Sequence, residues 1–171
     1  GMDIVNIGAV SFPAAADAAI RQGLAAKDDF EGILCRVTRN IQDQVNHLAD
    51  SYSRLLLPPA PYYSVLMTGC LERGSDLSNG NTYNNFGIHG AGSANAADAL
   101  AAVERFVFDD AALGSSELLE AVAANYEGHE VLRRRLADGG PKVGNNDPAA
   151  DALLARLFYS FAEACERYGR T

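Results

Sequence analysis

The sequence predicts a mainly α-helical domain that is interrupted by one long loop rich in glycine and asparagine. Three observations support this fold class. Apolar residues recur every three or four positions over residues 28–56, which is the spacing of an amphipathic helix. The second half is rich in alanine and leucine and contains residues that cap helices. Residues 74–95 change in composition to Gly, Asn, Ser and Thr, so we expect the long loop there.

The first half begins with a short extended segment at residues 3–10, which leads into a helix through Ser11, Phe12 and Pro13. Proline suits the first helical turn because its missing N–H would be unpaired there in any case. Gly23 is expected to interrupt or end this helix.

A long amphipathic helix is then expected over residues 28–56. Its apolar positions are Phe30, Leu34, Val37, Ile41, Val45, Leu48, Tyr52 and Leu55. Pro58, Pro59 and Pro61 stop it, because proline donates no backbone hydrogen bond and disfavours helical geometry in the residue before it. The apolar run 62–67 is too short for periodicity to separate a buried strand from a buried helix.

The second half predicts further helices, each with its own boundary signal. Asn95 is expected to cap one that runs to Phe108, and Ser116 to cap the next. A third short helix closes at the Gly139-Gly140 pair, and Asp147-Pro148 begin the last one as N-cap and first helical residue. The buried stripe of that last helix is expected to hold Leu153, Leu154, Leu157, Phe158, Phe161, Cys165 and Tyr168.

Length and charge indicate a single domain over residues 2–171 with no nucleic-acid partner. A chain of 171 residues is long enough to bury a core without disulfides. Its 14 basic and 22 acidic side chains give a net charge of −8, which opposes binding to phosphate backbones. No apolar stretch has the length of a membrane span. The three widely spaced cysteines suggest a reducing cytoplasm.

The loop contains the candidate ligand-binding residues Tyr83, Asn84 and His89. Its pattern Gly87-x-x-Gly90-x-Gly92 invites comparison with a phosphate-binding loop. It matches neither the Walker pattern nor the dinucleotide fingerprint. The alternative is a tightly folded loop whose glycines adopt positive φ and whose asparagines bond the local backbone.

Cys70 and Glu72 are the candidate catalytic residues. A lone thiol becomes a nucleophile only when a base or a helix N-terminus lowers its pKa, and a buried inert thiol is the alternative. We expect Cys35 and Cys165 to be buried beside apolar helix stripes. His47, His89 and His129 lack the spacing of metal ligands, so no metal or cofactor is expected.

Eight short blocks carry a resemblance to a known family. They are Leu57 to Ser64, Gly69 to Leu77, Tyr83-Asn84, Asn95 to Val103, Val107 to Asp109, Glu117 to Ala121, Ala124 to Gly128 and Pro141 to Asp147. Their order and spacing resemble the glycyl radical enzymes, the pyruvate formate-lyase-like lyases and dehydratases. The resemblance covers nearly the whole chain but only an internal piece of the family's catalytic domain. It implies part of an α/β barrel scaffold.

The family implies two radical residues, and neither role carries over here. One is a thiyl cysteine in Gly-Cys-Val/Ile-Glu-Pro, whereas Gly69-Cys70-Leu71-Glu72 is followed by Arg73. Its flanks resemble a downstream family segment that also contains Gly-Cys-x-Glu-Arg-Gly. The other is a glycine in Arg-Val-x-Gly-Tyr, a context that Gly169 lacks. The sequence also departs from the family at Asn79-Gly80-Asn81 and is shortened near residues 26–30.

The leading hypothesis is therefore a truncated glycyl radical enzyme that is inactive alone. Its partners would be a second copy of the chain or the remaining enzyme segments. The alternative is a stand-alone helical module that self-associates or pairs with another protein. The parent substrate stays open among glycerol, choline, hydroxyproline and pyruvate-type compounds.

Overall fold

The computed structural model describes residues 3–52, 54, 56–80 and 84–168. Its chain divides into two compact units. Unit 1 comprises Gly1–Ala9 and Asn46–His89, and unit 2 comprises Val10–Val45 and Gly90–Thr171. The single domain over residues 2–171 stays a prediction.

The first strand and helix form where the sequence predicts them. Strand β1 is Asp3–Ser11 and helix α1 is Phe12–Ala26. Ser11 caps α1, because its hydroxyl accepts a hydrogen bond from Ala14 N at 3.3 Å. The prediction that Gly23 interrupts or ends the helix was wrong. A Cβ there would lie 2.6 Å from Cγ1 of Ile33, so this glycine allows close packing. The helix ends instead at Ala26, and Lys27 caps it with φ of 61°.

Helix α2, Phe30–Tyr52, is the predicted long amphipathic helix, although it is shorter than residues 28–56. Asp29 accepts a hydrogen bond from Gly32 N at 2.8 Å, and Asp28 pairs with Arg36 at 2.6 Å. Both acidic residues stand just before the helix, where its dipole favours negative charge, and Asp29 satisfies an N–H of the first turn. The buried face of α2 consists of Ile33, Leu34, Val37, Ile41 and Val45.

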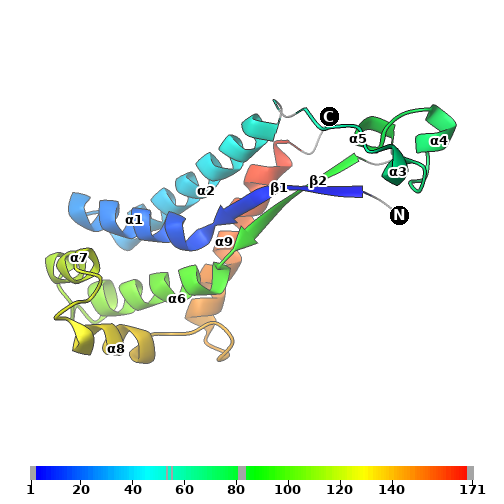
Figure 1. Cartoon of the computed structure of the whole chain (residues 1–171). Coiled ribbons are helices and arrows are strands. Elements are labelled where there is room, and N and C mark those ends of the chain that lie inside the picture. Colours follow the sequence, from blue (N-terminus) through cyan, green and yellow to red (C-terminus); the bar gives the residue numbers. More distant parts are fainter. Residues whose placement is uncertain (1–2, 53, 55, 81–83, 169–171) are drawn as a thin grey trace. The chain divides into compact units, whose positions relative to one another are not determined.

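The long Gly/Asn-rich loop predicted at residues 74–95 was wrong. That stretch contains helix α5, Leu77–Gly80, strand β2, Asn84–Ala91, and the start of helix α6. Strands β1 and β2 form a two-stranded sheet and run in the same direction (Figure 1). Glycine is needed here for close approach, since a Cβ at Gly90 would lie 2.4 Å from the ring of Phe12.

The remaining helices of unit 2 are α6, Ser93–Val103, α7, Ser115–Ala123, α8, Glu130–Gly139, and α9, Pro148–Glu166. A π-helical segment, Glu104–Asp109, continues α6. Helix α6 packs against α1 and α9, and α1 also packs against α7 (Figure 1). This packing places α6 between α1 and α9.

Two of the predicted helix caps were wrong and two were confirmed. Gly92 rather than Asn95 precedes α6, and Gly114 rather than Ser116 precedes α7. Asp147 caps α9 by accepting from Ala149 N at 3.0 Å, and α8 ends at Gly139 as expected. Short polar residues are common in this sequence, so a cap signal near a boundary identifies the turn but not the residue.

The core of unit 2 confirms part of the predicted stripe on α9. Leu153 and Leu157 are buried, whereas Phe158 and Tyr168 are 46% and 45% exposed. The ring of Phe12 meets the rings of Phe158 and Phe161 edge to face, at centroid distances of 6.0 and 5.7 Å. The expectation that Cys35 is buried was wrong, because its position on α2 faces outward.

Unit 1 contains three short helices, α3, Pro61–Ser64, α4, Cys70–Arg73, and α5. They lie together in Figure 1. The run 62–67 is one helical turn with exposed apolar side chains rather than a buried strand. Within the described residues no helix has both the length and the apolar character needed to cross a membrane.

Candidate functional site

Cys70 lies at the start of α4 and its side chain is 2% exposed. A Cβ at Gly80 would lie 3.1 Å from Cys70 Sγ and 2.7 Å from the carbonyl oxygen of Ser75. Gly80 therefore lets the chain close over the thiol. A nucleophilic thiol needs access to its substrate, whereas this one is packed inside unit 1. Glu72 is on the same short helix and is exposed.

Asp76 organises the loop around Cys70, and the sequence interpretation missed it. Its carboxylate accepts hydrogen bonds from Ser64 Oγ at 2.7 Å, Ala60 N at 2.8 Å and Ser78 N at 3.2 Å. These bonds, the one from Ser64 first, lower the pKa of Asp76 to about 2. A carboxylate with that pKa is a poor general acid or base near neutral pH. The Asp-x-Ser spacing, typical of an Asx turn, was the available signal.

The candidate ligand-binding residues do not form a described site. Tyr83 lies outside the described residues. Asn84 begins β2, with its side chain outside the described part. His89 is on β2 and is exposed.

The glycine pattern lies in the second half of β2 and ends at Gly92, just before α6, and the space beside two of its glycines is occupied by protein. A Cβ at Gly90 would meet Phe12, and one at Gly92 would lie 2.6 Å from Cγ of Pro13. Both glycines thus accommodate the beginning of α1. A phosphate would need that same space, so the arrangement supports neither a nucleotide nor a dinucleotide site.

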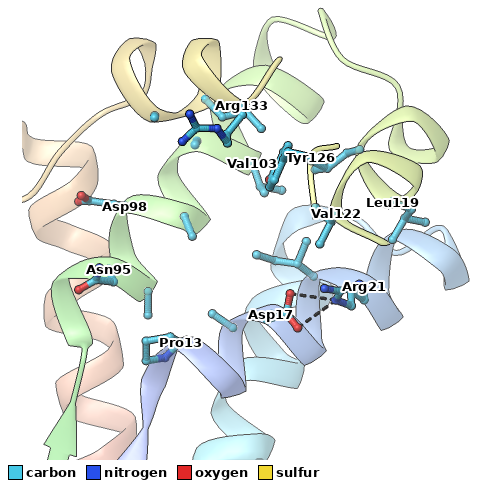
Figure 2. Close-up of a pocket in the computed structure, with 18 of the residues that line it drawn as sticks. Pro13, Asp17, Arg21, Asn95, Asp98, Val103, Leu119, Val122, Tyr126 and Arg133 are labelled. Atoms are coloured by element: carbon cyan, nitrogen blue, oxygen red, sulfur yellow. Dashed lines mark hydrogen bonds and ion pairs between the residues drawn. The ribbon is translucent and has the colours of Figure 1, made fainter. Parts of the chain in front are cut away.

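Unit 2 contains a cavity of about 590 Å³ between α1, α6, α7 and α8 (Figure 2). Its walls are mainly apolar, and its polar groups lie on separate helices. On α1, Arg21 Nε donates to both carboxylate oxygens of Asp17 at 2.9 Å. On α6, Asp98 accepts from Val143 N at 2.8 Å and lies 4.0 Å from Lys142 Nζ.

The wall after α7 has an unusual backbone. Asn125 and Tyr126 have φ of 51° and 61°, in the left-handed region that non-glycine residues rarely adopt. Tyr126 N donates to Ala121 O at 2.7 Å and His129 N to Tyr126 O at 2.9 Å, which holds this turn. Burial raises the pKa of Tyr126. Sequence reasoning missed the cavity because its residues come from four helices.

In the described ranges, no group of three or more His, Cys, Asp or Glu side chains has a geometry that could hold a metal ion. The two best-defined features are therefore the closed loop around Cys70 and the cavity of unit 2.

The chain is similar to dehydratases in sequence. It is 37% identical over 109 residues to the probable dehydratase YbiW of Escherichia coli, covering 61% of this chain and 13% of that protein. It is 34% identical over 104 residues to trans-4-hydroxy-L-proline dehydratase of Clostridioides difficile, covering 60% and 13%. The chain thus spans about 13% of the length of these curated relatives.

The fold is similar to that of a solved enzyme. The glycerol-bound B12-independent glycerol dehydratase of Clostridium butyricum superposes with a TM-score of 0.79 at 21% identity, over 91% of this chain and 22% of that one. The Pyruvate formate lyase-like family model matches residues 33–171. The chain spans only part of the length of these enzymes. Since the family match covers most of the chain, this protein belongs to the pyruvate formate lyase-like family of glycyl radical enzymes.

Proposed function

We propose that the chain is a segment of a glycyl radical lyase or dehydratase and carries out no radical chemistry alone. The observation that carries this proposal is the small share of its relatives' length that the chain spans. The family match runs over residues 33–171, yet the chain spans about 13% of the curated dehydratases it resembles. Its working form would include further polypeptide that supplies the rest of the barrel.

The sheet supports this proposal. Within the described residues it consists of β1 and β2 only, running in the same direction. Parallel sheets occur almost entirely as larger, covered sheets, and a two-stranded sheet is marginal by itself. Strands from the remaining barrel would extend this sheet at its outer edges.

Exposed apolar side chains in unit 1 support it as well. Leu56, Tyr62 and Leu66 are 96%, 87% and 78% exposed. Neighbouring exposed apolar positions on the same unit mark an interaction surface. We define Leu56, Tyr62, Tyr63, Val65, Leu66 and Leu71 as the apolar surface of unit 1.

The thiyl role belongs, in this proposal, to a cysteine outside the chain. Arg73 stands three residues after Cys70, where the resemblance requires proline, and the Cys70 thiol is buried against Gly80. Gly169 has neither of the flanks that the resemblance requires for the radical glycine. The substrate would be set by segments that this chain does not contain.

The absence of disulfides at Cys35, Cys70 and Cys165 fits a location in the reducing cytoplasm.

Electron paramagnetic resonance tests the radical part of the proposal. The chain is incubated anaerobically with an S-adenosylmethionine-dependent activase of the family, with an intact dehydratase as the positive control. We expect the glycyl doublet in the control only. A stable doublet from this chain would overturn the proposal.

Complementation tests the assembly part. The chain is co-expressed with a dehydratase relative from which the matching segment has been deleted. We expect the two chains to co-elute, and the double variant Tyr62→Ser, Leu66→Ser to weaken the complex. Val131→Ser is the matched control, since Val131 is 84% exposed on unit 2 and lies outside the apolar surface of unit 1. Separate elution of the unmodified chains would contradict the proposal.

A second candidate function is a self-associating helical module, which the same apolar surface favours. Light scattering of the chain alone separates the two. A stable dimer that Tyr62→Ser, Leu66→Ser dissociates supports self-association, whereas a monomer that joins only the complementing chain supports the enzyme segment.

A further inference from the structure

The cavity of unit 2 has the size and surface of a ligand site. Its volume of about 590 Å³ is within the range of about 300–1,000 Å³ typical of small-molecule sites. The buried apolar residues that line it are Ala16, Ile20, Ala102, Val103 and Leu118. An apolar ligand body that covers these residues would be removed from water.

Of the charged side chains that line this cavity, four form two ion pairs with one another, and one arginine stays available to a ligand. Asp17 is paired with Arg21, and Asp98 with Lys142. Arg133 on α8 lines the cavity on the side opposite α1 (Figure 2). Its guanidinium makes no hydrogen bond or ion pair with another described residue.

Glu130 is one turn earlier on α8 and does not take up this cation by a hydrogen bond. Its Oε1 accepts from Gly128 N at 3.1 Å instead. The backbone N–H groups at this helix start are the main reason that the pKa of Glu130 is lowered, and the charge of Arg133 contributes last. The carboxylate is therefore directed at the helix start.

The turn that forms the cavity wall is held in a fixed conformation. Asn125 and Tyr126 are consecutive left-handed residues, and hydrogen bonds on both sides of the turn maintain them. Backbone strain of this kind persists only where surrounding structure enforces it, and it is concentrated at functional sites. Figure 2 shows Tyr126 between Val103 and Val122 at the edge of the cavity.

We propose that this cavity binds an amphipathic anion, with its carboxylate on Arg133 and its aliphatic body against the apolar walls of α1, α6 and α7. Arginine suits this role because its planar guanidinium donates two parallel hydrogen bonds to a carboxylate. The apolar body accounts for the rest of the affinity through the area it removes from water. The proposal does not depend on the enzyme-segment function, because every group in it belongs to unit 2.

Calorimetric titration of the full chain tests the ligand class. Decanoate is the probe, and decanol, decyltrimethylammonium and acetate are the comparisons, all below their micellar or solubility limits. We expect decanoate to bind one per chain, decanol and the cation to bind at least about tenfold more weakly, and acetate not to bind. Equal affinity for decanoate and decanol would overturn the proposal, because the anion would then contribute nothing.

Variants locate the site. Arg133→Gln is expected to weaken decanoate binding about tenfold. Arg134→Gln, the adjacent arginine that does not line the cavity, is the matched control and should leave binding unchanged. Ala99→Phe, which places a ring in the cavity from an exposed position of α6, should abolish binding with the helical circular dichroism retained.

One further variant tests whether decanoate binds the apolar surface of unit 1 instead of the cavity. Leu66→Ser removes part of the apolar surface of unit 1 and should not change decanoate binding. If Leu66→Ser weakens binding while Arg133→Gln and Ala99→Phe do not, the fatty anion binds unit 1 and the proposal is wrong. Equal losses in Arg133→Gln and Arg134→Gln would reduce it to a general charge effect and would also overturn it.

Discussion

The hydroxyl of Ser64 lies 2.7 Å from Oδ1 of Asp76 and accepts a hydrogen bond from Leu77 N at 2.9 Å. It therefore connects the end of α3 with the start of α5. Ser64 is 7% exposed, so this connection is shielded from water. The same carboxylate oxygen accepts from Ala60 N, which brings three separate parts of the loop around Cys70 to one point.

Ser64→Ala should destabilise this loop. It removes the donor to Asp76 and leaves Leu77 N without its hydroxyl acceptor, at a cost of about 1–2 kcal/mol. Hydrogen exchange at Leu77 and urea denaturation measure the effect. Ser75→Ala is the control, because the Ser75 hydroxyl is exposed and lies 3.3 Å from Arg73 O. Equal effects of the two variants would contradict the role of Ser64.

The stability of the loop around Cys70 should fall at acidic pH because of Asp76. Its pKa of about 2 in the folded chain is below the usual value of about 3.9 in an unfolded chain. The stabilisation is therefore present above pH of about 4 and is lost as the pH falls through about 2. Hydrogen exchange at Ala60 and Ser78 should accelerate over that window. Asp76→Asn should exchange faster at neutral pH and lose this pH dependence, and an unchanged acid profile would refute the assignment.

The three cysteines should react with iodoacetamide in a defined order. Cys35 is exposed and should be alkylated first. Cys165 is intermediate in exposure, and burial raises its pKa, so its thiolate fraction is smaller and it should react more slowly. Cys70 is buried and should react only after urea is added. Mass spectrometry of timed digests gives the order, and early labelling of Cys70 would revive it as a nucleophile candidate.

Gly90→Ala should destabilise unit 2 through a clash with the Phe12 ring. The added Cβ would be 2.4 Å from that ring, and overpacking of this kind costs about 1–3 kcal/mol. Phe12→Leu in the Gly90→Ala background should recover part of the loss, whereas Phe12→Leu alone should be destabilising. Thermal denaturation of the four chains forms a double-mutant cycle.

Gly114→Ala is the control for that cycle. A Cβ there has no other atom within 4 Å, and the residue has φ of −72°. We expect a loss below about 1 kcal/mol, since alanine is a poorer N-cap than glycine. Additive effects of Gly90→Ala and Phe12→Leu would show that the two residues do not meet as described.

Local signals accounted for the helices but not for their ends. The spacing of Ile33, Val37, Ile41 and Val45 predicts α2 because amphipathic periodicity follows from helix geometry alone. Asp147 was identified as a cap because a cap bonds within three residues of itself. Ser11 was placed at the entrance of α1, and the structure shows that it caps this helix. Asn95 and Ser116 carry the same chemistry yet do not cap, because the helices begin one or two residues earlier.

Contacts between distant residues account for what was missed. Glycine, asparagine and serine in residues 74–95 indicate a loop by composition. Gly90 instead lies in a strand that pairs with β1, and its missing side chain leaves room for the Phe12 ring. The cavity of unit 2 was equally out of reach, since four helices contribute its walls.

By itself, therefore, the sequence determined the helical character of the chain and its family, because periodicity, caps and ordered motif blocks are properties of neighbouring residues. The tertiary structure alone decided that Cys70 is a packed thiol and that Gly90 and Gly92 accommodate α1. It also decided that Arg133 faces an apolar cavity. Each of these depends on which surfaces the folded chain brings together, and burial and access are defined only by that packing.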